Sequence, residues 1–81
     1  MNWKDDLEQK VKELGDTLIE CTSTDEEMKR KFDGGYGGEE GSPFTAWGEK
    51  YVYFPICYDG SEWIGHAPRN PCAERMPHQG G

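Results

Sequence analysis

The dipeptide Asp59-Gly60 limits what this chain can fold into more than any other feature. It separates two runs rich in aromatic and β-branched residues, at 50–58 and 61–67. Asp-Gly between such runs favours a two-residue type I′ turn, because both central residues of that turn need positive φ. The predicted hairpin register places Ile56 opposite Trp63, Phe54 opposite Gly65 and Tyr53 opposite His66.

Strand alternation sorts the side chains of this hairpin onto two faces. We expect one face to form the hydrophobic core, and it carries Val52, Phe54, Ile56 and Trp63. The other face carries Tyr51, Tyr53, Ile64 and His66. Tyrosine beside histidine is typical of surfaces that bind a partner or stack on a base, so we expect this face to be free for binding. Cover by the C-terminal tail or by a second subunit is the alternative.

A further strand is expected before the hairpin. Phe44-Thr-Ala-Trp47 and a turn at Gly48-Glu49 make 44–67 a three-stranded antiparallel meander. Pro55 has no amide hydrogen, so its position is expected at a solvent edge or a bulge. Residues 68–81 contain three prolines and end in two glycines, which predicts an extended C-terminal tail.

The N-terminal part reads as helical. An apolar stripe at helical spacing predicts a helix over residues 3–21, with Gly15 inside it, and is formed by Leu7, Val11, Leu14, Leu18 and Cys21. Such a stripe packs either on the chain's own core or on a second copy, as a homo-oligomer through this helix. Two overlapping capping boxes, Ser23 with Glu26 and Thr24 with Glu27, predict a second, short helix.

The predicted fold is therefore α+β in a single domain, 1–81. It consists of an acidic helical part at 1–33, a Gly-rich loop at 34–43, the meander at 44–67 and the tail at 68–81. Five glycines between 33 and 43 make regular structure costly in the loop.

The net charge of −7 is concentrated in the first half of the chain. Residues 1–41 carry twelve Asp and Glu against six Lys and Arg, whereas residues 42–81 carry four against three. Such a field repels nucleic acid and anionic membranes and favours a basic partner, so we expect neither of the first two as a ligand. A solubilising helix surface is the alternative interpretation.

Cysteine usage and the N-terminus favour the cytoplasm. Three cysteines without a C-x-x-C pair fit a reducing compartment better than a disulfide scaffold. The start of the chain lacks the positive and apolar regions of a signal peptide, and no apolar run approaches the length of a membrane span.

No constellation of residues predicts an enzyme, a cofactor or a metal site. Cys57, His66, Cys72 and His78 are of the types that bind zinc, but their spacings of nine, six and six match no known zinc motif. The same separation argues against a Cys-His nucleophile pair, and adjacent solvated carboxylates are not held across a cleft as acid–base catalysis requires.

Several segments resemble short accessory proteins encoded by tailed bacteriophages. These segments are Ser42-Pro-Phe-Thr-Ala-Trp47, Tyr51-Val-Tyr-Phe-Pro55, Tyr58-Asp-Gly60, Trp63 and Pro68-Arg-Asn-Pro-Cys72. The resemblance covers 42–81 and not the acidic helices. It implies an early phage product of the kind that inhibits bacterial defence, including anti-CRISPR proteins and proteins that sequester cyclic-nucleotide signals.

We therefore expect a non-enzymatic inhibitor that blocks a basic, nucleic-acid-binding surface of a host defence protein in the bacterial cytoplasm. The candidate partner-binding residues are Asp33, Tyr36, Glu39, Glu40, Tyr51, Tyr53, His66 and Arg69. One alternative is an oligomeric sponge that encloses a cyclic nucleotide with Tyr51, Tyr53, His66 and Arg69. A second alternative is a structural component of a phage or host assembly.

Overall fold

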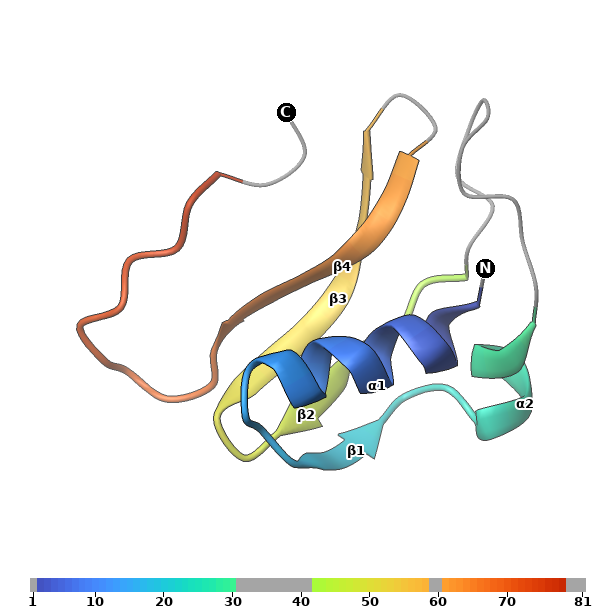
Figure 1. Ribbon diagram of the computed structural model, residues 1–81, viewed down its shortest axis with the longest axis horizontal. Coiled ribbons are helices and arrows are strands. Elements are labelled where there is room, and N and C mark those ends of the chain that lie inside the picture. Colours follow the sequence, from blue (N-terminus) through green and yellow to red (C-terminus); the bar gives the residue numbers. More distant parts are fainter. Residues whose placement is uncertain (1, 31–41, 59–60, 79–81) are drawn as a thin grey trace.

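A computed structural model describes residues 2–30, 42–58 and 61–78. The elements are α1 (Trp3–Glu13), β1 (Leu18–Cys21), α2 (Asp25–Lys29), β2 (Ala46–Gly48), β3 (Tyr51–Tyr58) and β4 (Ser61–Pro68). The strands form one antiparallel sheet in the order β1-β2-β3-β4, and α1 crosses in front of it (Figure 1). The α+β class is confirmed, but the described sheet has four strands rather than the three that were predicted.

The hairpin register is confirmed. Ile56 pairs with Trp63, Phe54 with Gly65 and Tyr53 with His66, and the ladder runs from Tyr58–Ser61 to Tyr51–Pro68. On its other edge β3 pairs with β2 through Tyr53–Ala46 and Val52–Trp47. The turn residues 59–60 lie outside the described residues. A two-residue loop alone was sufficient to fix this register, since each strand position follows from the turn.

The prediction of one helix over residues 3–21 is wrong. The helix α1 ends at Glu13, and Gly15 follows with φ +62°. The amides of Gly15 and Asp16 donate to the carbonyls of Lys12 and Val11 at 3.1 and 3.0 Å, which is the Schellman pattern that ends many helices. Gly15 therefore ends the helix instead of lying inside it.

The extra strand β1 forms from the residues that follow this stop. Leu18, Glu20 and Cys21 pair with Gly48, Trp47 and Ala46, with an irregularity between Leu18 and Glu20. Leu18 and Ile19 are 40% and 57% exposed, so the second half of the predicted helical stripe does not enter the core as a helix face would. Leu14 and Cys21 still pack against the core from the two sides of the stop.

The short helix α2 begins as predicted from one of its two capping boxes. Thr24 is the N-cap, its hydroxyl accepts from the Glu27 amide at 3.2 Å, and the Glu27 carboxylate accepts from the Thr24 amide at 3.1 Å. Met28 is 5% exposed and joins the core. Phe32, the other apolar residue expected on this helix, lies outside the described residues.

The core forms on the opposite face of the hairpin from the predicted one. Its buried residues are Trp3, Leu7, Val11, Met28, Phe44, Ala46, Tyr53 and Ile64. Tyr53 is 0% exposed, whereas Val52, Phe54, Ile56 and Trp63 are only half-buried. The expectation that the tyrosine face is free is therefore wrong, although the register on which it rested is right. Both faces are apolar enough to be covered, so alternation alone did not decide between them.

Candidate functional site

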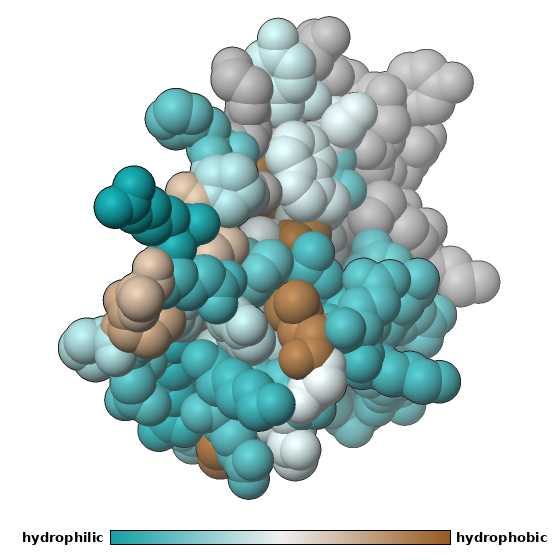
Figure 2. All heavy atoms as spheres, turned by 60° about the vertical axis from the view of Figure 1, so that its left-hand side comes forward, coloured by the Kyte–Doolittle hydropathy of each residue, from teal (hydrophilic) through white to brown (hydrophobic). Residues whose placement is uncertain are grey.

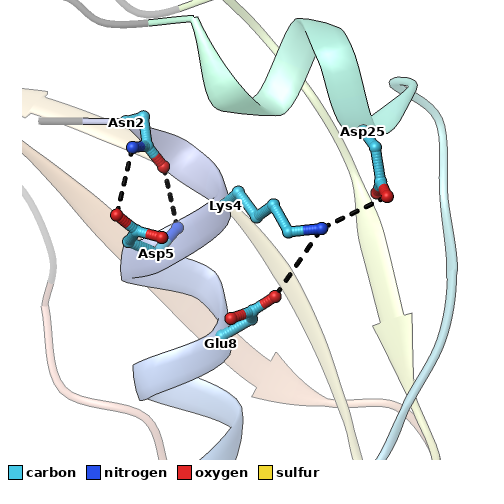
Figure 3. Close-up of polar contacts among 5 residues, drawn as sticks. All are labelled: Asn2, Lys4, Asp5, Glu8 and Asp25. Carbon is cyan, nitrogen blue, oxygen red and sulfur yellow. Dashed lines mark hydrogen bonds and ion pairs between the residues drawn. The ribbon is translucent and has the colours of Figure 1, made fainter.

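The acidic surface predicted for the N-terminal half is built by α1 and α2, which lie next to each other (Figure 1). The ammonium group of Lys4 on α1 links them, because it lies 3.2 Å from the Asp25 carboxylate on α2 and 3.8 Å from Glu8 on its own helix (Figure 3). The side chains of Asp25 and Glu8 remain 78% and 62% exposed. One lysine thus joins the two helix surfaces without covering their carboxylates.

The start of α1 places further acidic groups on this surface. Asn2 is the N-cap, and its side-chain oxygen accepts from the Asp5 amide at 2.8 Å while its side-chain amide donates to the Asp5 carboxylate at 3.1 Å (Figure 3). Asp5 and Asp6 occupy the first turn, where the helix dipole stabilises negative charge. Burial raises the pKa of Asp6 above its usual value, and the neighbouring Asp5 carboxylate acts in the same direction.

In α2 the first turn is entirely acidic. Asp25, Glu26 and Glu27 follow the N-cap, and all three are exposed. Glu27 is tied into the capping box, whereas the carboxylate of Asp25 reaches Lys4. The outward surface of the two helices therefore presents Glu8, Asp25 and Glu26 to solvent. We call these three residues the acidic helix surface.

A second polar group, which the sequence did not reveal, surrounds Asp16. Its carboxylate accepts from the amides of Thr17 at 2.8 Å, Lys50 at 2.9 Å and Tyr51 at 3.2 Å. It also accepts from the Tyr53 hydroxyl at 2.7 Å. The Schellman turn after α1 places this carboxylate against the turn between β2 and β3, so that one side chain fastens the helix end to the sheet.

The hydrogen bonds around Asp16 shift the pKa values of both partners. Desolvation would raise the pKa of Asp16, but the hydrogen bonds from Tyr53 and the three amides outweigh it and hold that pKa below its usual value. Burial, followed by the bond to Asp16, raises the pKa of Tyr53 well above its usual value. Tyr53 is thus a neutral hydrogen-bond donor in the core, and it has no surface with which to meet a partner.

Tyr51 and His66 do lie together, as the register predicted. Their rings meet edge to face with centroids 5.2 Å apart, and the Tyr51 hydroxyl donates to the Glu74 carboxylate at 3.2 Å. The charge of Glu74 is the main cause that raises the pKa of Tyr51. Burial lowers the pKa of His66, with Lys10 acting in the same direction and Glu74 against it. The tail and the end of α1 therefore both reach this pair.

The remaining predicted site residues are not gathered at one place. Arg69 continues the ladder beyond β4 through its amide, which donates to the Lys50 carbonyl at 2.9 Å, and its guanidinium donates to the Gly48 carbonyl at 3.1 Å. Asp33, Tyr36, Glu39 and Glu40 lie outside the described residues. Among the eight candidates, the rings of Tyr51 and His66 are in contact, and Tyr53 is the cross-strand partner of His66.

A pocket of about 190 Å³ opens between α1 and β4. Its lining residues are Asp6, Gln9, Lys10, Glu13, Trp63 and Ile64. Pockets for small-molecule ligands usually measure about 300–1,000 Å³. This pocket is therefore smaller than a nucleotide needs, and its lining includes none of the predicted nucleotide-binding residues.

Metal chemistry finds no support in the residues described. No three His, Cys, Asp or Glu side chains within 2–30, 42–58 and 61–78 are grouped in a way that would hold a metal ion. The thiols of Cys21, Cys57 and Cys72 are unpaired, the first two half-buried and the third exposed.

The side of the molecule seen in Figure 2 is mostly hydrophilic, with small separate hydrophobic areas.

Comparisons with protein-family models, with curated proteins and with solved structures found no match. Among the described residues, no helix combines the length and the apolar character that crossing a membrane requires.

Proposed function

We propose that the protein is a non-enzymatic, phage-type inhibitor that binds and blocks a basic, nucleic-acid-binding surface of a bacterial defence protein. The observation that carries the proposal is the acidic helix surface, in which one lysine joins two acidic helices and leaves their carboxylates exposed. The phage resemblance of 42–81 supplies the biological setting.

The arrangement of charge supports this function in two ways. Glu8, Asp25 and Glu26 project from rigid helices, which display carboxylates at fixed positions much as a nucleic-acid backbone displays phosphates. Complementary charge also speeds encounter with a basic surface, at rates that fall as salt rises. Residues 1–41 contain twelve acidic and six basic residues, so this half of the chain carries a net negative charge.

The structure changes which residues are expected to make the contact. Tyr53 is withdrawn as a partner-binding residue, because it lies fully inside the core. The contact is assigned instead to Glu8, Asp25 and Glu26, together with the predicted residues Asp33, Tyr36, Glu39 and Glu40, which lie outside the described residues.

No observation on the described residues favours the cyclic-nucleotide sponge. Of its four predicted contacts, Tyr53 is buried, and the guanidinium of Arg69 directs one of its N–H groups to the Gly48 carbonyl. The apolar stripe of α1, through which the sponge was expected to oligomerise, supplies Leu7 and Val11 to the chain's own core. A structural role in a phage or host assembly remains an untested alternative.

The test is affinity capture from bacterial lysate with the tagged protein, followed by mass spectrometry of the captured proteins. The variant Glu8→Lys/Glu26→Lys reverses two charges on the acidic helix surface. Its matched control is Glu49→Lys, which reverses an exposed charge in the turn between β2 and β3. We expect a nucleic-acid-binding protein to be captured by the parent and the control, and to be lost with the double variant.

Salt supplies an independent readout. Capture that weakens as the salt concentration rises is expected from an electrostatic contact. Undiminished capture by Glu8→Lys/Glu26→Lys at low salt would contradict the proposed surface. A captured partner without a basic surface would contradict the proposed mechanism.

A further inference from the structure

The face of the sheet turned away from the helices is apolar. By the observed register it carries Trp47, Val52, Phe54, Ile56 and Ala67, and we call these residues the open face. Trp63 follows the same alternation but also lines the pocket beside α1, so it is not counted among them. They alternate along the strands with the core residues Ala46, Tyr53 and Ile64. Both described helices supply their buried residues to that other side, so neither covers the open face.

Gly65 shows how the open face is packed. A side chain at this position would collide with the end of Ile56 and come within 3.0 Å of the Phe54 ring. The side chains of Phe54 and Ile56 therefore already fold over the glycine and close the gap that it leaves in β4. The result is a continuous apolar surface without a hole at its centre, which is the form of surface that another sheet can cover.

Charge is arranged differently on the two sides of the sheet. Of the charged residues described, strand alternation places Glu20 and Arg69 on the open side, at one end of the sheet and of opposite sign, whereas the Lys50 ammonium donates to the Gly15 carbonyl at the end of α1. The acidic helix surface lies on the opposite side. Two copies of a chain with net charge −7 repel each other, and that repulsion is smallest when their open faces meet and their helices point outward.

The area of the open face is sufficient for an association of modest strength. The eight-residue strands β3 and β4 cover roughly 26 Å by 10 Å, and the three residues of β2 add about 50 Å², which gives about 300 Å² from the usual rise and strand spacing. A stable dimer of standard size buries about 800 Å² per partner, and weaker complexes bury less. Apolar patches of about 300–600 Å² on a monomer are often functional.

We propose that the open face is a self-association surface, on which a second copy of this chain packs sheet to sheet. The two sheets then lie about 10 Å apart, as in a β-sandwich, and Phe54 and Ile56 of each copy are covered by the other. The dimer displays two acidic helix surfaces on its outer sides. This inference does not depend on the proposed function, since it concerns the other side of the sheet.

Sedimentation velocity from about 10 µM to about 500 µM tests the proposal, because an interface of this area is expected to be weak. We expect the sedimentation coefficient to rise with protein concentration towards that of a dimer. Higher salt is expected to strengthen the association, because it screens the repulsion between two acidic chains. A monomer at all concentrations would overturn the proposal.

The variant Ile56→Lys places a charge at the centre of the open face and is expected to weaken self-association at least about tenfold. Ile19→Lys is the matched control, since Ile19 is 57% exposed on the edge strand β1 and lies outside the open face. Circular dichroism of dilute protein checks that both variants keep the fold. Dimers lost with Ile19→Lys and kept with Ile56→Lys would assign self-association to the edge of β1 and overturn the open face.

If Ile56→Lys unfolds the monomer, Val52→Thr is the second variant. It keeps the shape of the side chain while adding a polar group, and it is likewise expected to weaken the dimer. An unchanged dimer with a folded Val52→Thr protein would contradict the assignment.

Discussion

The two faces of the β3–β4 hairpin are both apolar, yet the two described helices cover only one of them. The covered face holds Tyr53 and Ile64, and the open face holds Phe54 and Ile56. The covered face is also the one on which a polar group needs a partner, and Asp16 supplies it by accepting from the Tyr53 hydroxyl. Hydrophobicity alone therefore does not decide which face is buried, whereas a hydrogen-bond acceptor outside the strands does distinguish the two faces.

The largest effect is expected from truncating one residue on each face. Ile64→Ala removes a side chain that is 5% exposed in the core and should cost about 3 kcal/mol of unfolding free energy. Ile56→Ala removes the same atoms from the half-buried open face and should cost about 1 kcal/mol in the monomer. Urea unfolding of dilute protein, below the concentration of self-association, measures both. Equal losses would show that the open face is covered within a single chain.

The next largest loss of stability is expected from removing the Asp16 carboxylate, which accepts from the Tyr53 hydroxyl on the covered face. Asp16→Ala leaves the Tyr53 hydroxyl in the core without its acceptor and releases three amides of the turn, which should cost about 2 kcal/mol. Glu49→Ala, at an exposed position of the same turn, should change stability by less than about 0.5 kcal/mol. A small loss for Asp16→Ala would mean that the buried tyrosine finds another acceptor.

The Asp16 carboxylate also makes the free energy of unfolding depend on pH. Because the pKa of Asp16 is lower in the folded chain than its usual value of 3.8, its contribution is complete above that value and is lost as the pH falls through the folded pKa. Asp16→Asn removes this titration. The unfolding free energy of the variant should therefore fall less steeply below pH 3.8 than that of the parent.

Local signals explain which parts of the fold could be predicted from the sequence. The register of the hairpin follows from Asp59-Gly60, and the start of α2 follows from Thr24 and Glu27, because in both cases the interacting residues are close in sequence. The negative charge of the helical part could be predicted because charge is counted without knowledge of contacts, but Glu8, Asp25 and Glu26 were not among the predicted partner-binding residues.

The predictions that were wrong depend on contacts between residues that lie far apart in the sequence. Leu14, Leu18 and Cys21 fit a helical stripe, and Gly15 was read as a defect within it although Gly15-Asp16 is also a signal for a helix end. Strand β1 forms because β2 offers it an edge, which no local pattern reveals. Asp16 meets Tyr53 across 37 positions in the sequence, so neither the covered face nor the polar group around Asp16 followed from spacing.

A smaller effect is expected where the covered face meets the tail. Burial keeps the pKa of His66 below its usual 6.5, so its neutral form favours the folded state. That contribution is complete above pH 6.5 and is lost as the pH falls towards the folded pKa, because the unfolded chain takes up the proton first. His66→Gln should flatten the decline in thermal midpoint between about pH 7.5 and 5.5. A decline as steep in His66→Gln as in the parent would show that another group is responsible for it.

The smallest effect is expected on the outer surface of the helices. Lys4→Ala and Asp25→Ala should each change the unfolding free energy by less than about 0.5 kcal/mol, because an ion pair whose side chains are 28% and 78% exposed is screened by water and salt. A double-mutant cycle in low and high salt measures the coupling, and a value above about 1 kcal/mol would make the pair a structural element. A weak coupling would show that the Lys4–Asp25 ion pair contributes little to the stability of the fold. The covered face and Asp16 maintain the fold, whereas the acidic helix surface can change its charges at little cost to stability, so its charge variants can be compared for partner binding without loss of the fold.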